Sequence, residues 1–284
     1  MADHLQPARH RQGDFFVADI LDAAPKDDLG SMEHPLFALK AGDRQVRHYE
    51  RGGASVTVEP GHGGLATIHD KDVWIYCISQ LVAAMNHYRE DVGPTVRFTA
   101  YDFLVATNRP TSGAGYERMA DALERLDSTR LRTNIETGET RERRGFGLVE
   151  SWRVIERGQD NRMVAVEVTL PDWLYRAVQE RQVLTLSRDY FRLRKPIDRR
   201  LYELARKHCG AQARWRVGLK TLQEKAGSRA ALREFRRAVG ALAKADPLPD
   251  YRVHYNPKTD AVTFYLRGQR GGRAQVKDAT EGRI

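Results

Sequence analysis

The sequence has few cysteines and no long apolar run, and each absence narrows what the protein can be. Its two cysteines, Cys77 and Cys209, are far apart, which favours a reducing compartment and a structural role over a disulfide or a zinc site. No apolar stretch approaches the length of a membrane span, and the polar N-terminus has no signal-peptide core. We therefore expect a cytoplasmic protein without a membrane partner.

Sequence motifs for catalysis are also missing. No segment has the GxxxxGK[ST] pattern of a phosphate-binding loop, which argues against an ATPase. A metal-dependent DNA-nicking initiator needs paired histidines and a tyrosine nucleophile, whereas His48, His62 and His69 are scattered. Asp70 and Asp72 are typical of a helix N-terminus rather than of a metal site. We therefore expect no catalytic residues, no metal and no cofactor, with a nickase or primase as the enzymatic alternative.

What the chain has in excess is positive charge. Its 284 residues include 47 lysines and arginines against 38 acidic residues, a formal net charge of +9. Such an excess favours an acidic polymer as partner, with nucleic acid ahead of an anionic membrane. Apolar residues make up 41% of the chain, which is enough for the cores of two globular domains.

The most informative segment comprises residues 219–242. It predicts a short helix, a glycine-centred turn and a longer helix that begins at Arg229. Apolar residues share one side of the longer helix, and four arginines gather on the side turned away from it: Arg229, Arg233, Arg236 and Arg237. Guanidinium groups match phosphate oxygens and the guanine edge, so this helix is typical of one that meets DNA. The alternative is a solvated surface with local pairing to Glu234.

The surrounding elements predict a winged helix-turn-helix domain. A helix at 197–208 and a strand at 215–217 precede the helix pair, and strands at 251–255 and 261–266 form the wing. Residues near a recognition-helix N-terminus usually contact base edges, so Arg229 and Arg233 are expected there. Arg236 and Arg237 would instead hold phosphates. Ser228 is expected to cap the longer helix and to touch a phosphate. Lys220 of the first helix and Lys258 of the wing are expected to contact the DNA backbone.

A similar order of elements occurs earlier in the chain. Helices are predicted at 70–88, 100–107 and 116–126, a strand at 95–99 and a wing from strands at 129–135 and 146–155. In this first winged helix we expect DNA contacts from Ser112 and Arg118 at the recognition helix, and from the wing arginines Arg141, Arg143 and Arg144. Glu117, Asp121 and Glu124 share the helix with Arg118, so the alternative is that this unit mainly contacts protein.

The predicted fold class is therefore α+β, with two tandem winged helix-turn-helix domains and small antiparallel sheets. Four parts are expected: a disordered arm at 1–13, an N-terminal winged-helix domain with a hairpin extension at 14–170, a C-terminal winged-helix domain at 171–267 and a basic disordered tail at 268–284. Two such domains can occupy successive major grooves on one face of a duplex.

Four segments also resemble a known family: DKDVWIYCISQLVAAMN (70–86), FTAYDFLVATNR (98–109), GYERMADALERLDSTRLRTNI (115–135) and LSRDYFRLRKPIDRRLYELARKHCG (186–210). They are similar to the plasmid replication initiator protein A family, and the resemblance extends from about Asp14 to Leu266. The family is similar in organisation to iteron-binding initiators with two winged helices.

This resemblance implies a protein that binds double-stranded DNA at repeated sites of a plasmid origin, the iterons. It further implies opening of an adjacent AT-rich segment and recruitment of the host replication initiator and helicase. Related initiators bind iterons as monomers and repress their own promoter as homodimers. The alternative function is a winged-helix transcriptional repressor that acts at inverted repeats.

Overall fold

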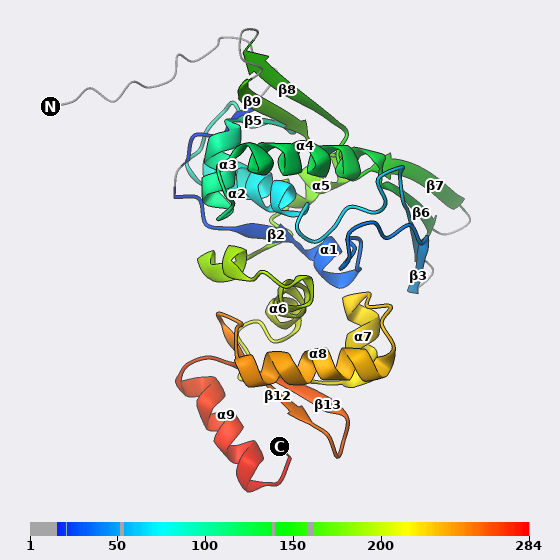
Figure 1. Ribbon diagram of the computed structural model, residues 1–284, viewed down its shortest axis with the longest axis vertical. Helices are drawn as coiled ribbons and strands as arrows, with labels where there is room; N and C mark the ends of the chain where they lie inside the picture. Colours follow the sequence, from blue (N-terminus) through cyan, green and yellow to red (C-terminus); the bar gives the residue numbers. More distant parts are fainter. Residues whose placement is uncertain (1–15, 21, 52–53, 138–139, 158–161, 284) are drawn as a thin grey trace, which may run out of the picture.

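Two buried apolar clusters divide the molecule into two stacked units (Figure 1). The computed structural model describes residues 16–20, 22–51, 54–137, 140–157 and 162–283, so the predicted arm at 1–13 lies outside the described residues. The sequence predicts a domain boundary at residue 171, but helix α5 (Asp172–Gln179) buries Leu174 and Val178 in the first cluster. The boundary therefore follows α5, because the apolar side of this helix completes the core of the first unit.

The first unit packs helices against a small mixed sheet. Its helices include α2 (Asp72–Asn86), α3 (Ala100–Ala106) and α4 (Gly113–Ser128), and α2 is buried along most of its length. The sheet has the strand order β1–β5–β9–β8, with these bounds: β1 (Phe16–Val17), β5 (Thr95–Phe98), β8 (Ser151–Arg157) and β9 (Arg162–Thr169). Only the β1–β5 pairing in this sheet is parallel. The tight packing around α2 makes it the central helix of the unit.

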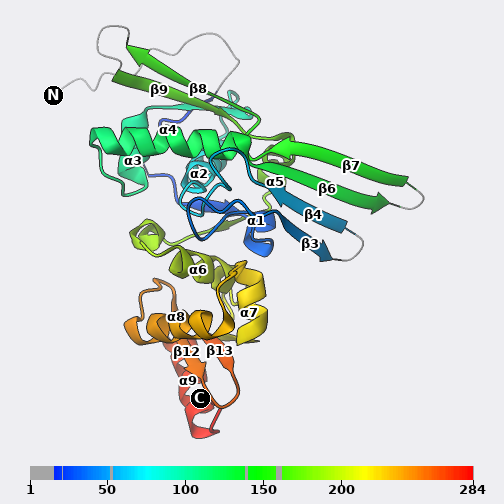
Figure 2. The ribbon, with the colours of Figure 1, turned by 45° about the vertical axis from the view of Figure 1, so that its right-hand side comes forward.

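A second sheet projects sideways from the first unit (Figure 2). It is antiparallel, in the order β3–β4–β6–β7: β3 (Arg47–Arg51), β4 (Ala54–Glu59), β6 (Arg130–Thr137) and β7 (Thr140–Gly147). The prediction of a two-stranded wing at 129–155 is therefore wrong, because the hairpin beside β5 is β8–β9. The bend between β7 and β8 contains buried Leu148 and Val149 instead of ordinary turn residues, so the sequence carried no turn signal there.

The second unit repeats the element order of the first. Helix α6 (Pro196–His208), strand β11 (Arg214–Gly218), helices α7 (Leu219–Ala226) and α8 (Leu232–Ala245), and strands β12 (Tyr251–Asn256) and β13 (Ala261–Leu266) follow in sequence. Its sheet order, β11–β13–β12, matches β5–β9–β8 of the first unit, since in each the first strand pairs with the last. The two units thus share one arrangement of helices and strands.

The C-terminal segment contains a helix, α9 (Gln269–Thr280), so the disorder predicted for the tail at 268–284 is wrong for these residues. The Tyr265 hydroxyl donates a 2.7 Å hydrogen bond to Asp278, and Gly271 lies so close to the Leu266 carbonyl that a side chain would not fit. Alternate residues of a strand face opposite sides, and Val262 and Phe264 point into the core beneath α8. Helix α9 therefore covers the face of β13 that is turned away from α8.

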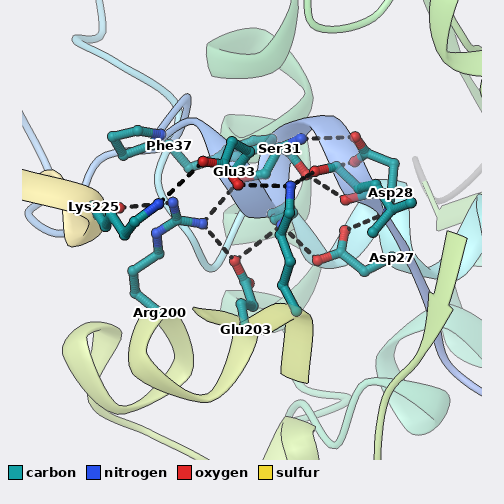
Figure 3. Close-up of polar contacts among 12 residues, drawn as sticks. Asp27, Asp28, Ser31, Glu33, Phe37, Arg200, Glu203 and Lys225 are labelled. Atoms are coloured by element: carbon teal, nitrogen blue, oxygen red, sulfur yellow. Dashed lines mark hydrogen bonds and ion pairs between the residues drawn. The ribbon is translucent and has the colours of Figure 1, made fainter. Parts of the chain in front are cut away.

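The joint between the units contains a buried network of charges (Figure 3). The Lys71 ammonium at the start of α2 lies 2.6 Å from Asp27 and 3.1 Å from Glu203 of α6, and all three side chains are buried. Arg200 approaches Glu203 to 3.2 Å and donates to the Ser31 carbonyl. The smaller elements of this region are β2 (Lys26–Asp28), α1 (Leu29–Glu33), the pairing strand β10 (Val183–Thr185) and the 3₁₀ helix η1 (Arg188–Arg192).

Two apolar side chains strengthen this joint. Met32 of α1 and Ile75 of α2 come from the first half of the chain but belong to the second buried cluster. Buried charges hold one geometry because the loss of a partner leaves an uncompensated ion. The joint therefore fixes α7 and α8 relative to the first unit.

Among the described helices, none is long and apolar enough to cross a bilayer.

Candidate nucleic-acid interface

Helix α8 begins at Leu232, three residues later than the sequence predicts. Gly227 ends α7 in the left-handed conformation, and the Gln223 side-chain amide donates to the Ala230 carbonyl at 2.7 Å, which holds residues 228–231 as a turn. The N-cap is Ala231, which has no side-chain oxygen. The predictions that Ser228 caps the helix and that Arg229 belongs to it are therefore wrong, and both residues lie in the turn.

The outer side of α8 is a basic stripe. The side chains of Arg233 and Arg237 are 88% and 82% exposed, and they form ion pairs with Glu234 at 3.5 and 2.7 Å. Lys244, which the sequence analysis missed, is exposed at helical spacing from Arg237. The stripe spans roughly 16 Å at 1.5 Å per residue. Phe235, Val239 and Leu242 are buried, as the sequence predicts.

Small residues separate Arg237 from Lys244 along the stripe. Gly240 and Ala241 occupy the intervening turn, so α8 has little side-chain bulk there. Arg233, Arg237, Gly240 and Lys244 follow one another at intervals of four, three and four residues, which places them on one side of a helix. This spacing in the sequence is the signal that could have identified Lys244. An anionic surface could approach the helix backbone closely at this point.

Arg236 is held by the wing instead of lying on the stripe. Its Nε and Nη2 atoms donate to the two carboxylate oxygens of Asp260 at 3.1 and 2.9 Å, and Nε also donates to the Tyr255 hydroxyl at 3.1 Å. These hydrogen bonds to Asp260 and Tyr255 raise the pKa of the Arg236 guanidinium above its ordinary value. Arg236 thus ties α8 to the β12–β13 hairpin, and the phosphate contact that the sequence predicts for it stays a prediction.

The other predicted contacts of the second unit lie on elements next to α8. Lys220 is exposed on α7, and Lys258 is exposed in the turn between β12 and β13. Both α7 and β12 pack against α8. The Asn256 side chain accepts hydrogen bonds from the Lys258 and Thr259 amides, which shapes this turn. Lys220 and Lys258 are therefore exposed on elements that adjoin α8 or lead from a strand packed against it.

The equivalent helix of the first unit, α4, has a different surface. Ser112 is its N-cap but makes no side-chain capping bond, and Arg118 is exposed. Arg125 turns inward and forms a bidentate pair with Asp70 at 2.8 and 2.9 Å. The exposed residues around Arg118 are mostly acidic: Glu117, Asp121, Glu124 and Asp127. No basic stripe comparable to that of α8 occurs on this described helix.

The predicted wing arginines of the first unit are not on a wing. Arg141, Arg143 and Arg144 belong to β7 of the projecting sheet, whereas the hairpin equivalent to β12–β13 is β8–β9. Arg144 is exposed, and the side chains of Arg141 and Arg143 lie outside the described part of the chain. These three residues therefore belong to the projecting sheet and not to the hairpin that is equivalent to β12–β13.

Comparisons with known proteins place this arrangement in context. The family model described as Replication initiator protein A matches residues 26–253. A putative replication protein of Wigglesworthia glossinidia brevipalpis is 40% identical over 257 residues, which cover 89% of this chain and 94% of that protein.

Two solved structures are similar in fold. A selenomethionine crystal structure of domains 2 and 3 of RctB has a TM-score of 0.61 at 11% identity, covering 85% of this chain and 97% of that one. A second crystal structure of RctB domains 2–3 has a TM-score of 0.57 at 12% identity, covering 80% and 92%. These likenesses extend across both units of the α+β fold. The family match over most of the chain and the relative at 40% identity lead to one assignment: the chain belongs to the replication initiator protein A family.

Proposed function

We propose that this chain is a plasmid replication initiator that binds double-stranded DNA at repeated origin sites, the iterons, through its second unit. The order of helix, strand, two helices and hairpin over residues 196–266 supports a winged helix-turn-helix. The observation that carries the proposal is the outer side of α8, where Arg233, Arg237 and Lys244 are exposed opposite a buried apolar side.

In this proposal α8 enters the major groove, which is about 12 Å wide in B-DNA and admits a helix. Arg233 is in the first turn of α8, where residues of recognition helices reach base edges, so we assign it to readout. Arg237 and Lys244 lie farther along the helix and would contact phosphates, as would Lys220 and Lys258 from the adjacent elements.

The first unit would serve protein contacts. The acidic side of α4 would repel a phosphate backbone, and Arg141, Arg143 and Arg144 belong to β7 of the projecting sheet and not to α4. We therefore assign the host replication initiator and helicase, or a second copy of this chain, to the first unit. Origin opening would follow from DNA binding and recruitment, without catalysis by the chain itself.

A titration of the full-length protein against its plasmid origin and against scrambled DNA, at several salt concentrations, tests the proposal. The logarithm of the association constant for origin DNA should fall linearly with the logarithm of the salt concentration. The reason is that lysine and arginine side chains that contact phosphates release counterions from the duplex. Arg233→Ala should cost about 1–3 kcal/mol and relax base preference, whereas Arg237→Ala should weaken all sequences alike and lower the salt slope.

Arg192→Ala is a matched control for these variants. Its side chain is 76% exposed and forms an i,i+3 pair with Asp189 at 2.9 Å, as Arg237 does with Glu234. It should leave DNA affinity unchanged. Equal affinity of the unaltered protein for origin and scrambled DNA would refute the proposal. A footprint on a lone palindrome would favour the repressor, and nicking of supercoiled origin DNA with Mg²⁺ would contradict the absence of catalysis.

A further inference from the structure

A cleft of about 700 Å³ lies between the two units, beside the turn that precedes α8. Its walls are residues 39–45 and Arg47 of the first unit and residues 227–230 of the second. We refer to residues 39–47 as the 39–47 loop. The loop leads into β3 and therefore reaches from the projecting sheet to the α7–α8 turn.

The cleft is strongly positive. Lys40, Arg44 and Arg229 line it and are exposed, and no ion pair or hydrogen bond of their side chains occurs with another described residue. The one carboxylate in its wall, Asp43, is paired with Arg47 at 2.8 Å. Burial alone would raise the pKa of Asp43, but hydrogen bonds from Gln45 and Arg47 and the nearby charge of Arg229 lower it. With one carboxylate against four cationic side chains, the lining of the cleft keeps an excess of positive charge.

The walls of the cleft are held firmly. Arg47, which is 4% exposed in its side chain, reaches the Pro35 and Phe37 carbonyls at 3.4 and 3.3 Å while pairing with Asp43. The Leu65 amide donates to the Asp43 carbonyl at 2.7 Å. On the opposite wall a Cβ at Gly227 would lie 2.5 Å from Pro35, so the α7–α8 turn is packed directly against the first unit. The three cations are therefore presented by fixed backbone.

The cleft also adjoins an uncapped helix end. Ala231 offers no side-chain acceptor to the first amides of α8, and the N-terminus of a helix carries partial positive charge. Lysine and arginine around such an end, on an open cleft, match the phosphates of a nucleic-acid backbone. An enclosed apolar pocket for a small molecule would have a different lining.

We infer that the 39–47 loop binds backbone phosphates of the same duplex whose major groove receives α8. This inference rests on the proposed function and extends it, because it makes the first unit contribute to DNA binding through Lys40 and Arg44 and not through α4. Arg229, on the opposite wall, would complete the phosphate contact from the second unit. The contact carries no base information, so it would set affinity and register only.

The test is the double variant Lys40→Ala/Arg44→Ala in the full-length protein. The control is Arg273→Ala/Lys277→Ala, which removes one lysine and one arginine from the exposed side of α9, beyond the sheet face opposite α8. The loop variant should bind origin and scrambled DNA more weakly by the same factor, about tenfold or more. Its log–log salt slope should fall by about 1–2, because roughly 0.9 is lost for each phosphate contact.

Two outcomes of these DNA titrations would overturn the inference. A loop variant that binds like the α9 control would show that the cleft does not touch DNA. If Arg233→Ala still weakened binding in that case, the proposed function would stand while the loop contact failed. A loop variant with altered base preference would show readout instead of phosphate binding.

A small phosphate-containing anion is the alternative ligand for the cleft, because it offers the three cations the same phosphate oxygens as the DNA backbone. Titration with inorganic phosphate and with a nucleoside triphosphate, followed by the amide resonances of Gly227 and Gly42, distinguishes the two. Saturable binding of either at micromolar concentration, without any change in DNA affinity, would assign the cleft to a small anion and overturn the inference. An Arg44→Lys variant should retain most of the DNA affinity, since a phosphate contact needs the charge.

Discussion

Helices α4 and α8 occupy equivalent positions in two units of the same architecture, yet their exposed sides carry opposite charge. Both units place a strand before a helix pair and close with a hairpin whose last strand pairs with the first. On α8 the outer side shows Arg233 and Arg237, whereas on α4 it shows Glu117, Asp121 and Glu124. The arrangement of the backbone is thus repeated while the surface chemistry is not, and function follows the surface.

Helices α3 and α7, which precede α4 and α8, also differ in the residues that they expose. Helix α3 exposes Tyr101 and Val105, at 56% and 54%, one turn apart on the same side. The exposed residues of α7 are polar and include Lys220. An exposed apolar pair offers apolar area to a protein partner and no charge to a phosphate backbone. The contrast fits our proposal of protein contacts in the first unit and DNA contacts in the second.

The largest expected effect is loss of the joint that holds the two units together. Lys71→Ala would leave Asp27 and Glu203 buried side by side without the ammonium that lies 2.6 and 3.1 Å from them. We expect a loss of about 3–5 kcal/mol in the free energy of unfolding. Urea unfolding at neutral pH measures it, with Arg192→Ala as a surface control. A loss below about 1 kcal/mol would mean that the units do not depend on this network.

Acid should weaken the joint through His69. Burial first, and then the charge of Arg199, lower the pKa of His69 from 6.5 to about 4. Because the unfolded chain protonates His69 near pH 6.5 and the folded protein only near pH 4, the unfolded state gains no advantage from this proton above pH 6.5. Stability is lost as the pH falls toward 4, by at most about 1.4 kcal/mol per pH unit.

His69→Gln should remove this slope. Other buried groups titrate in the same range, so the measurement is the difference between the unfolding free energies of the two proteins at pH 7, 6, 5 and 4. The difference should narrow or reverse as the pH falls. A constant difference would show that His69 does not titrate as its surroundings indicate.

Much of this comparison could be predicted from the sequence, and the missed parts have physical causes. Helical periodicity located α2, α4, α6 and α7 to within a few residues, because an apolar stripe identifies a helix that packs on a core. The bend at Leu148–Glu150 was missed because its apolar residues are buried. The helix α9 was missed because its stability comes from Tyr265 and Arg214, which are distant in sequence.

The candidate site was predictable in part for the same reason. Periodicity alone identified Arg233 and Arg237 on the outer side of α8. It could not show that Arg236 pairs with Asp260, nor that residues 39–47 reach the α7–α8 turn, since both depend on tertiary contacts. Short-range patterns identify helix sides, whereas ion pairs and clefts require the folded chain.

Neutralising the acidic side of α4 sharpens the comparison. In the triple variant Glu117→Gln, Asp121→Asn and Glu124→Gln, three negative charges are lost without a change in shape. If α4 stays outside the groove, DNA affinity should rise by less than about 1 kcal/mol, through long-range attraction alone. Filter binding at 50 and 200 mM salt measures it. A larger gain together with changed base preference would mean that α4 also enters DNA.

The smallest expected effect is that of Arg236→Ala, which separates an arginine held by the wing from the arginines of α8 that are proposed to contact DNA. Arg236→Ala removes an ion pair whose two side chains are each 40% exposed, so the free energy of unfolding should fall only slightly. Base preference should remain unchanged, because the guanidinium is held by Asp260 and Tyr255 and not offered to DNA. Asp260→Asn should reproduce the same small loss if the wing contact is the cause. A relaxed base preference in Arg236→Ala but not in Asp260→Asn would instead mean that Arg236 leaves the wing when DNA binds, and that the basic stripe includes it.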